Sequence, residues 1–242
     1  MGVDTRFWGP SGWQLFHLIA FRSDHPTDVL SIMQDVLPCK FCRESTTEYV
    51  KEHPLQGDAG KWLYDIHNKV NHKLRTQCKD NPDVINPGPD PTFEEVKERY
   101  ASMTAVDVPG RDFLFSIASN YPSKPTSPDM ELQKTFMDRL SKAYPFPKLR
   151  KAFQSYMKSR AIELDSKKEY MKWMYGLLYR LGQTIDVEIP SYKGYVQRVM
   201  YYTSGCDKPS YRGKTCRRVD GGGLTKNRDH TRTRRITKLS LL

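Results

Sequence analysis

Residues 61–74 read KWLYDIHNKVNHKL, and their apolar positions recur every four residues. These positions are Trp62, Ile66, Val70 and Leu74. Because a helical turn takes about 3.6 residues, these side chains form a stripe along one face, and we expect a helix from about Ala59 to Arg75. His67 and Asn71 are also four residues apart, which places a polar pair beside this stripe. The stretch therefore predicts a long helix whose buried side also carries polar groups.

The same spacing predicts helices on both sides of this stretch, whereas the alternation typical of strands is scarce. The predicted helices of the first half cover residues 12–22, 27–37, 39–53, 59–75 and 93–103. Pro38 ends the second of them, because the residue before a proline is pushed out of the helical region. Residues 80–92 are rich in helix breakers and are expected to form a loop. The predicted fold class is therefore all-α.

A weaker copy of the first half follows in the second half. LFHLIA at 15–20 matches LFSIAS at 114–119, PCKFCR at 38–43 matches PFPKLR at 145–150, and KWLY at 61–64 matches KWMY at 172–175. The matches keep their order and their offsets grow steadily, which favours a duplication with loop insertions over chance similarity of amphipathic helices. We predict a domain over residues 1–104, a degenerate helical copy over 105–205 and a basic tail over 206–242.

The second half lacks the polar side chains of the first. In this alignment Phe146 and Leu149 replace the two cysteines of the C-x-x-C motif, Ser116 replaces His17, Leu178 replaces His67, and Gly182 replaces Asn71. The helices are thus kept while the chemistry is lost. We expect the first half to be the working domain, and the second half to be structural or to bind a partner.

Charge is concentrated at the C-terminal end. The 242 residues carry a formal net charge of +11, and residues 207–242 contribute eleven Lys or Arg against three Asp. This glycine-rich tail is predicted to stay flexible until it meets a partner. Nucleic acid is a disfavoured partner, because bases stack on aromatic side chains and Tyr211 is the one aromatic residue of the tail. An acidic protein or an RNA stays open as the tail's partner.

The sequence carries no recognisable targeting or membrane signal. Its N-terminus lacks the basic and apolar regions of a signal peptide, and no run approaches the roughly 18 apolar residues that span a membrane. Arg6 stands where N-myristoylation requires Ser or Thr. We therefore expect no membrane association and no secretion through a signal peptide. Five cysteines are too few for a disulfide scaffold, so the single C-x-x-C indicates redox or metal chemistry.

The C-x-x-C motif lies in LPCKFCR at 37–43. Cys39 opens a predicted helix, so its sulfur is expected to be exposed at the positive end of the helix dipole, which favours the thiolate. Cys42, one turn further on, is expected to face the interior. Zinc is disfavoured because His67 and His72 lie about 140° apart around a helix, and a thioredoxin-type site requires a βαβ context. An inert structural disulfide stays open.

Three motifs in this order resemble the FAD-linked sulfhydryl oxidases of the Erv/ALR family. They are W-x-x-x-H at Trp13 and His17, P-C-x-x-C at 38–42, and H-N-x-V-N-x-K-L at 67–74. The resemblance covers about residues 8–100. It implies a four-helix bundle with a short fifth helix that binds FAD beside the two cysteines. No metal is expected.

The resemblance also implies a role for each matching residue. Cys39 would exchange disulfides with protein dithiol substrates, and Cys42, nearer the flavin, would pass the electrons to FAD and then to O₂, giving H₂O₂. Contacts with FAD are implied for Trp13, His17, Cys42, His67, Asn68, Val70, Asn71, Lys73 and Leu74. Pro10, Leu37 and Tyr64 depart from the family pattern. Tyr64 leaves Cys78 without its usual disulfide partner, so a free or buried thiol is expected there.

With its degenerate second half, the chain most resembles the two-domain members of this family from large DNA viruses. That resemblance implies a protein of the host cytoplasm or the virion. Cys206 and Cys216 are candidates for a shuttle pair on a mobile arm, because such an arm raises the effective concentration of thiol near Cys39. A loop-stapling disulfide or two unrelated thiols are the alternatives for this pair.

Two further questions stay open from the sequence. The family commonly forms dimers through its first helices, and Trp8, Phe16 and Phe21 are candidates for a homodimer surface that the second half could occupy instead. The alternative function is a non-enzymatic helical scaffold, in which Cys39 and Cys42 form a structural disulfide and the basic tail binds a partner.

Overall fold

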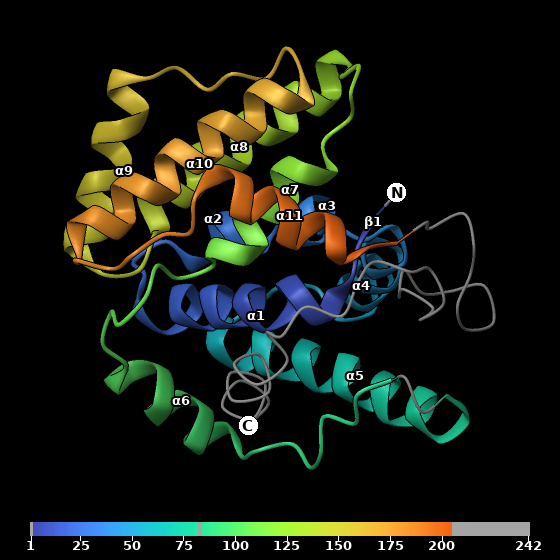
Figure 1. Ribbon diagram of the computed structural model, residues 1–242. Helices are drawn as coiled ribbons and strands as arrows, with labels where there is room; N and C mark the ends of the chain where they lie inside the picture. Colours follow the sequence, from blue (N-terminus) through green and yellow to red (C-terminus); the bar gives the residue numbers. More distant parts are fainter. Residues whose placement is uncertain (1, 82–83, 205–242) are drawn as a thin grey trace.

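Helices form almost all of the regular structure in this computed structural model, which describes residues 2–81 and 84–204 (Figure 1). Within these residues the helices are α1 (Thr5–Arg22), α2 (Pro26–Leu30), α3 (Met33–Val36), α4 (Lys40–Glu52), α5 (Ala59–Asp80), α6 (Phe93–Ser102), α7 (Arg111–Asn120), α8 (Ser127–Ala143), α9 (Pro147–Ser159), α10 (Lys167–Thr184) and α11 (Tyr192–Tyr201). One antiparallel ribbon pairs β1 (Gly2–Val3) with β2 (Thr203–Ser204). The all-α prediction is confirmed.

Helix α5 follows from the stretch that opened the sequence analysis. Its first turn is capped by Asp58, whose Oδ1 accepts a hydrogen bond from the amide of Lys61 at 2.9 Å. Trp62 and Ile66 of the predicted stripe are buried. The helix continues to Asp80, five residues past the predicted end at Arg75.

Two more of the predicted helices differ from those observed. The first begins at Thr5 rather than Gly12, because Asp4 caps it, with Oδ1 accepting from the amide of Arg6 at 2.8 Å, and Pro10 is accommodated inside it. The predicted helix over 27–37 is two short helices, α2 and α3, which separate at Ser31 and Ile32. Spacing of apolar residues cannot locate such a break, because both pieces bury the same face.

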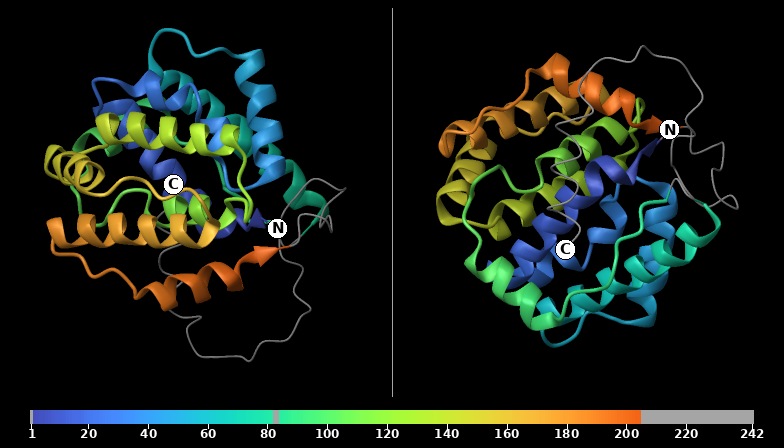
Figure 2. Two further views of the ribbon diagram at one scale, coloured as in Figure 1. Left: turned by 90° about the horizontal axis from the view of Figure 1, so that it is seen from above. Right: turned by 60° about the horizontal axis from the view of Figure 1, so that its bottom comes forward.

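The two halves pack against each other through matching elements. In the predicted duplication α7 corresponds to α1 and α8 to α2 and α3, and α1 indeed packs on α7 while α2 and α3 pack on α8. Pairing of an element with its own counterpart is what a two-fold interface produces. Figures 1 and 2 show the halves side by side, with α1, α5 and α6 on one side and α8 to α10 on the other. The domain boundary near residue 104 stays a prediction.

Aromatic side chains fill the contact between the halves. The ring of Phe113 lies 5.1 Å from that of Phe16 and 5.8 Å from that of Trp8, measured between centroids. Gly12 permits this approach, since a Cβ there would lie 3.1 Å from the Phe113 ring. Trp8 and Phe16 are buried within one chain, so the second half occupies the surface that these two residues were expected to offer to a homodimer.

Both ends of the described chain meet beside the residue that precedes Cys39. The amide of Val3 donates to the carbonyl of Pro38 at 3.4 Å, and the amide of Asp4 donates to that of Tyr202 at 2.8 Å. The ring of Tyr202 stacks on Phe7 with centroids 5.2 Å apart. We call β1, β2 and Tyr202 the terminal strap. Through it the C-terminal end of the second half is tied to the opening of α4.

Candidate functional site

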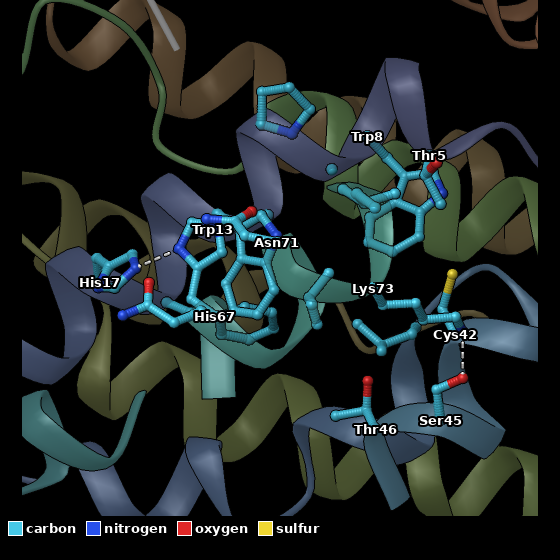
Figure 3. Close-up of a pocket in the computed structure, with 18 of the residues that line it drawn as sticks. Thr5, Trp8, Trp13, His17, Cys42, Ser45, Thr46, His67, Asn71 and Lys73 are labelled. Carbon is cyan, nitrogen blue, oxygen red and sulfur yellow. Dashed lines mark hydrogen bonds between the residues drawn. The ribbon is translucent and has the colours of Figure 1, made fainter. Parts of the chain in front are cut away.

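One cavity collects every site residue predicted within the described chain. It lies between α1, α4, α5 and α6 and is walled at one side by the loop before α6. Its lining includes Trp13, His17, Cys39, Cys42, His67, Asn68, Val70, Asn71, Lys73 and Leu74. Figure 3 shows Trp13 and His67 grouped away from Cys42, with Lys73 reaching toward the cysteine. The structure thus brings together nine side chains from three helices and the N-cap residue Cys39, while their individual roles stay predictions.

Flat rings form one end of the cavity. Trp13 stacks on His67 with ring centroids 3.9 Å apart and an angle of 11° between planes. Tyr100 from α6 stacks on His17 at 4.8 Å. Nε2 of His17 lies 2.9 Å from Nδ1 of His67, so one ring donates to the other. Nδ1 of His17 is buried without a hydrogen-bond partner. Leaving this atom unpaired costs free energy, and a hydrogen bond to a polar group of a bound ligand would remove that cost.

Burial keeps both histidines neutral. It lowers the pKa of His17 well below the ordinary value, and the neighbouring His67 lowers it further. Burial likewise lowers the pKa of His67 to about 4, although the carboxylate of Asp90 acts in the opposite direction. Neutral, stacked rings suit a flat and partly polar ligand better than an anion alone.

The two cysteines at the start of α4 have pKa values that are shifted in opposite directions. Cys39 is the N-cap residue, and its Sγ accepts a hydrogen bond from the amide of Cys42 at 3.3 Å. The neighbouring Cys42 thiol, with backbone amides and Arg43, lowers the pKa of Cys39 despite its burial. The contact with Cys39, followed by burial, raises the pKa of Cys42. In the dithiol form the negative charge therefore belongs on Cys39.

The predicted exposure of Cys39 is wrong. Cys39 is 1% exposed, and the two residues before it are tied down, Pro38 by the amide of Val3 and Leu37 by Nη1 of Arg43 at 2.6 Å. Cys39 does lie at the N-terminus of α4, as predicted. The helix dipole there favours the thiolate form of Cys39, but it says nothing about how exposed the sulfur is to solvent. The sulfur of Cys39 is therefore not directly open to bulk solvent.

Sequence reasoning missed several residues of the cavity. Arg99 and Tyr100 of α6 line it, as do Ser45 and Thr46 of α4. The capping box formed by Thr92 and Glu95 marks the start of α6, and Tyr100 lies four residues after the buried Val96, so helical spacing carried this signal. Ser45 and Thr46 lay outside the quoted motifs.

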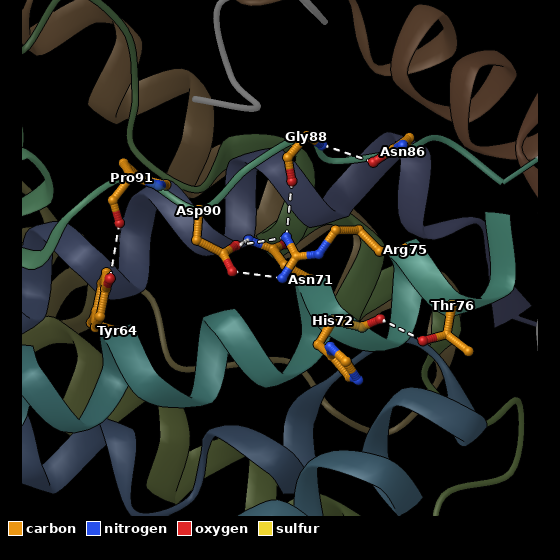
Figure 4. A network of polar contacts seen from close by, with 9 residues as sticks. All are labelled: Tyr64, Asn71, His72, Arg75, Thr76, Asn86, Gly88, Asp90 and Pro91. Atoms are coloured by element: carbon orange, nitrogen blue, oxygen red, sulfur yellow. Dashed lines mark hydrogen bonds and ion pairs between the residues drawn. The ribbon is translucent and has the colours of Figure 1, made fainter. Parts of the chain in front are cut away.

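A polar network that no motif predicted holds the wall of the cavity. Asp90 accepts from Nδ2 of Asn71 at 2.8 Å and pairs with Arg75 at 2.6 Å (Figure 4). Arg75 also donates to the carbonyl of Gly88 at 2.9 Å, and Tyr64 donates to that of Pro91 at 2.9 Å. The loop between α5 and α6 is thereby tied to the face of α5 that carries Asn71.

The corresponding groove of the second half is filled by protein. Tyr195 of α11 packs on Phe115 at 4.7 Å, and Tyr192 packs on Tyr175 at 5.5 Å. Gly182, at the position of Asn71, leaves room for Ile189, which would lie 2.4 Å from a Cβ. Leu178, at the position of His67, is fully buried. Apolar side chains thus replace the polar ones that a ligand would require.

Of the three remaining cysteines, the structure describes Cys78 alone. Cys78 is half-buried and unbonded. Cys206 and Cys216, the candidate shuttle pair, lie outside the described residues. Within residues 2–81 and 84–204, no three or more His, Cys, Asp or Glu side chains gather where they could hold a metal ion. In the same part of the chain, no helix is both long and apolar enough to cross a membrane.

Comparisons with known proteins bear on both halves. A sequence model of the Erv1 / Alr family matches residues 10–88 and 112–177. The chain is 33% identical over 85 residues to the mitochondrial FAD-linked sulfhydryl oxidase ERV1 of Saccharomyces cerevisiae, covering 30% of this chain and 45% of that protein. It is 33% identical over 79 residues to the FAD-linked sulfhydryl oxidase ERV1 of Oryza sativa subsp. japonica, covering 27% and 41%. The matches thus span less than half of each relative. No solved structure matches the chain.

Proposed function

This chain belongs to the Erv1 / Alr family, and on that premise we propose that it is an FAD-dependent sulfhydryl oxidase that forms disulfides in protein substrates. The observation that carries the proposal is the position of the C-x-x-C motif: Cys42 lines the same cavity as the stacked rings of Trp13 and His67. A dithiol at one end of a ring-lined cavity is what electron transfer from thiols to a flat cofactor requires.

The residues fit FAD. The faces of Trp13 and Tyr100 suit flat rings, the buried Nδ1 of His17 offers a polar contact that the protein leaves unmade, and Lys73 and Arg99 supply positive charge for an anionic cofactor. When bound, FAD would accept two electrons from a dithiol and pass them to O₂, which is reduced to H₂O₂. The matching residues of the first half would hold it.

The protein's own residues carry the thiol chemistry. A client thiolate attacks Sγ of Cys39 in the Cys39–Cys42 disulfide, so that a mixed disulfide forms and the sulfur of Cys42 leaves. A second client thiolate then attacks the client sulfur of the mixed disulfide and releases Cys39. The low pKa of Cys39 makes it the better leaving group in this step. Each client disulfide formed transfers two electrons to the Cys39–Cys42 pair, and the two protons of the client thiols pass to the reduced pair or to solvent.

Two finer assignments are part of the proposal. We assign the chain to the two-domain members found in large DNA viruses on the order of its motifs and its matching second half. We also propose that Cys206 and Cys216 relay electrons from clients to Cys39. Their position in the sequence supports this, because they closely follow Ser204 of the terminal strap. Ser204 pairs with Gly2, and the next residue, Val3, contacts Pro38. Changing both to serine should slow oxidation of a protein client and spare that of dithiothreitol.

The test of the main proposal begins with colour. The purified protein should be yellow, should release FAD on denaturation, and should consume O₂ with dithiothreitol. Cys42→Ala should abolish turnover and retain flavin, whereas Cys78→Ala should keep turnover. A colourless protein with an unreactive Cys39–Cys42 disulfide would instead support the scaffold alternative.

A further inference from the structure

Lys73 and Ser45 meet next to Cys42. Lys73 reaches from α5 to α4, where its Nζ donates a hydrogen bond to Oγ of Ser45 at 2.5 Å. Ser45 lies three residues after Cys42, so both project from the same side of α4. Figure 3 shows the end of the Lys73 side chain close to Cys42, with the contact to Ser45 drawn.

The hydroxyl of Ser45 is oriented by a second contact. Its one proton is donated to the carbonyl of Phe41 at 2.9 Å. A serine hydroxyl has one donor and two acceptor lone pairs, so with the proton so engaged, the oxygen can only accept from Lys73. The backbone of α4 thereby fixes where the lysine's charge is held.

Two other groups act on the pKa of Cys42 besides Lys73. Cys39 raises the pKa of Cys42 through their contact, and among nearby groups Lys73 and Arg43 lower it. Arg43 is engaged elsewhere, because it donates to the carbonyl of Leu37 at 2.6 Å. Of these two cations, Lys73 has the larger effect on the pKa of Cys42, whereas Arg43 also lowers that of Cys39.

We propose that Ser45 is a positioning residue, which holds the ammonium of Lys73 beside Cys42 so that negative charge on this sulfur is stabilised when the dithiol gives up its electrons. The inference rests on the proposed oxidase function. A flexible lysine side chain without the serine would spread over several rotamers, and its electrostatic effect on the sulfur would weaken with distance.

The test measures the ionisation of Cys42 directly. In a Cys39→Ser background the neighbouring thiol is absent, and the thiolate of Cys42 is followed by ultraviolet absorbance across pH, with Cys39→Ser/Cys42→Ser subtracted. We expect Ser45→Ala to raise the pKa of Cys42 by about one unit, which lowers its thiolate fraction at neutral pH about tenfold. Lys73→Met should do the same, and the double change should add little, because both remove one interaction.

Two matched variants complete the design. Ser45→Thr keeps the hydroxyl and should leave the pKa within a few tenths of a unit, and Thr47→Ala changes an exposed hydroxyl on the same helix and should have no effect. The inference is overturned if Ser45→Ala leaves the pKa unchanged, or if its effect and that of Lys73→Met add fully. Because the titration requires neither O₂ nor turnover, it stands apart from a failure of the oxidase proposal.

Discussion

Nε2 of His17 lies 2.9 Å from Nδ1 of His67, and the two rings come from α1 and α5. At this distance the pair shares one hydrogen, so protonating the second ring would place two donors face to face. Burial and the neighbouring ring both oppose that charge. The hydrogen bond therefore requires that the accepting nitrogen stays unprotonated, and burial favours the neutral form of both imidazoles.

Stability of the flavin-free protein should consequently fall in mild acid. In the unfolded chain both histidines have ordinary pKa values near 6.5, whereas in the folded chain the pKa of His67 is about 4 and that of His17 is also lowered. Below pH about 6.5 the unfolded state binds more protons, so stability is full above that pH and is lost toward pH 4. We expect His67 alone to contribute a loss of about 2 kcal/mol by pH 5, to which His17 adds, and urea unfolding measures the total.

The control separates this pair from general acid effects. His67→Gln removes one of the buried imidazoles and should flatten the dependence between pH 6.5 and 5, whereas His72→Gln, at an exposed position, should not. Equal slopes for the parent protein and His67→Gln would show that the pair does not govern acid stability.

Contact between the halves should contribute a large part of stability. Phe113 is fully buried against Phe16 and Trp8, so Phe113→Ala should cost about 3–5 kcal/mol through lost burial and the cavity it leaves. Urea unfolding followed by circular dichroism measures this cost. Tyr179→Ala, at a ring that is 46% exposed, should cost less than about 1 kcal/mol. Similar losses of stability for the two variants would mean that the contact between the halves is not part of the hydrophobic core.

Flavin content should be one per chain, although both halves match the same family. In the second half Tyr192 and Tyr195 fill the groove, and Leu178 stands where His67 stands in the first. The ratio of FAD released on denaturation to protein measures this directly. His67→Ala should remove essentially all of it, and a ratio near two would contradict the filled groove.

The sequence was most informative where a residue's environment is local. Helical spacing located α5, and Pro38 with the following cysteine located the N-cap of α4. The spacing of His67 and Asn71 on one face also predicted that both would reach the same cavity. These features depend on neighbours within a few residues, so the pattern alone could find them.

Features that depend on distant contacts were not predictable. The contact of Val3 with Pro38, beside the buried Cys39, joins distant parts of the chain, and the filling of the second groove needs α11 to return across α7. The ties of Asp90 to α5 span a loop without regular structure. Each of these features depends on packing between residues that are far apart in the sequence, and the periodicity of the sequence carries no signal for such contacts.

Loosening the loop between α5 and α6 should weaken flavin binding. Asp90 holds both Asn71 and Arg75, so Asp90→Ala frees the Asn71 amide and the cavity wall together. We expect the Kd for FAD to rise about tenfold, which corresponds to about 1.4 kcal/mol, measured by quenching of flavin fluorescence in titrations of flavin-free protein. Asp65→Asn, an exposed partner of Lys61 on the same helix, should leave the Kd unchanged. An unaffected Kd for Asp90→Ala would exclude the loop from binding.

Access to Cys39 should depend on the terminal strap. Phe7 anchors it by stacking on Tyr202 and by lying under Arg198, whose guanidinium is 5.3 Å from its ring. Phe7→Ala should therefore let Val3 leave Pro38 more often and raise the rate at which iodoacetamide alkylates reduced Cys39 several-fold, because local opening sets the reactivity of a buried group. Peptide-resolved mass spectrometry measures the rate at a fixed pH.

Met200→Ala provides the matched control, since this side chain of α11 is 69% exposed and its loss should not change alkylation. Cys39 also lines the cavity, so a thiol reagent has a second route that does not involve the strap. An unchanged rate in Phe7→Ala, with the flavin removed in both proteins, would show that reagents reach the sulfur through the cavity. Clients would then have to approach Cys39 from the side of Cys42.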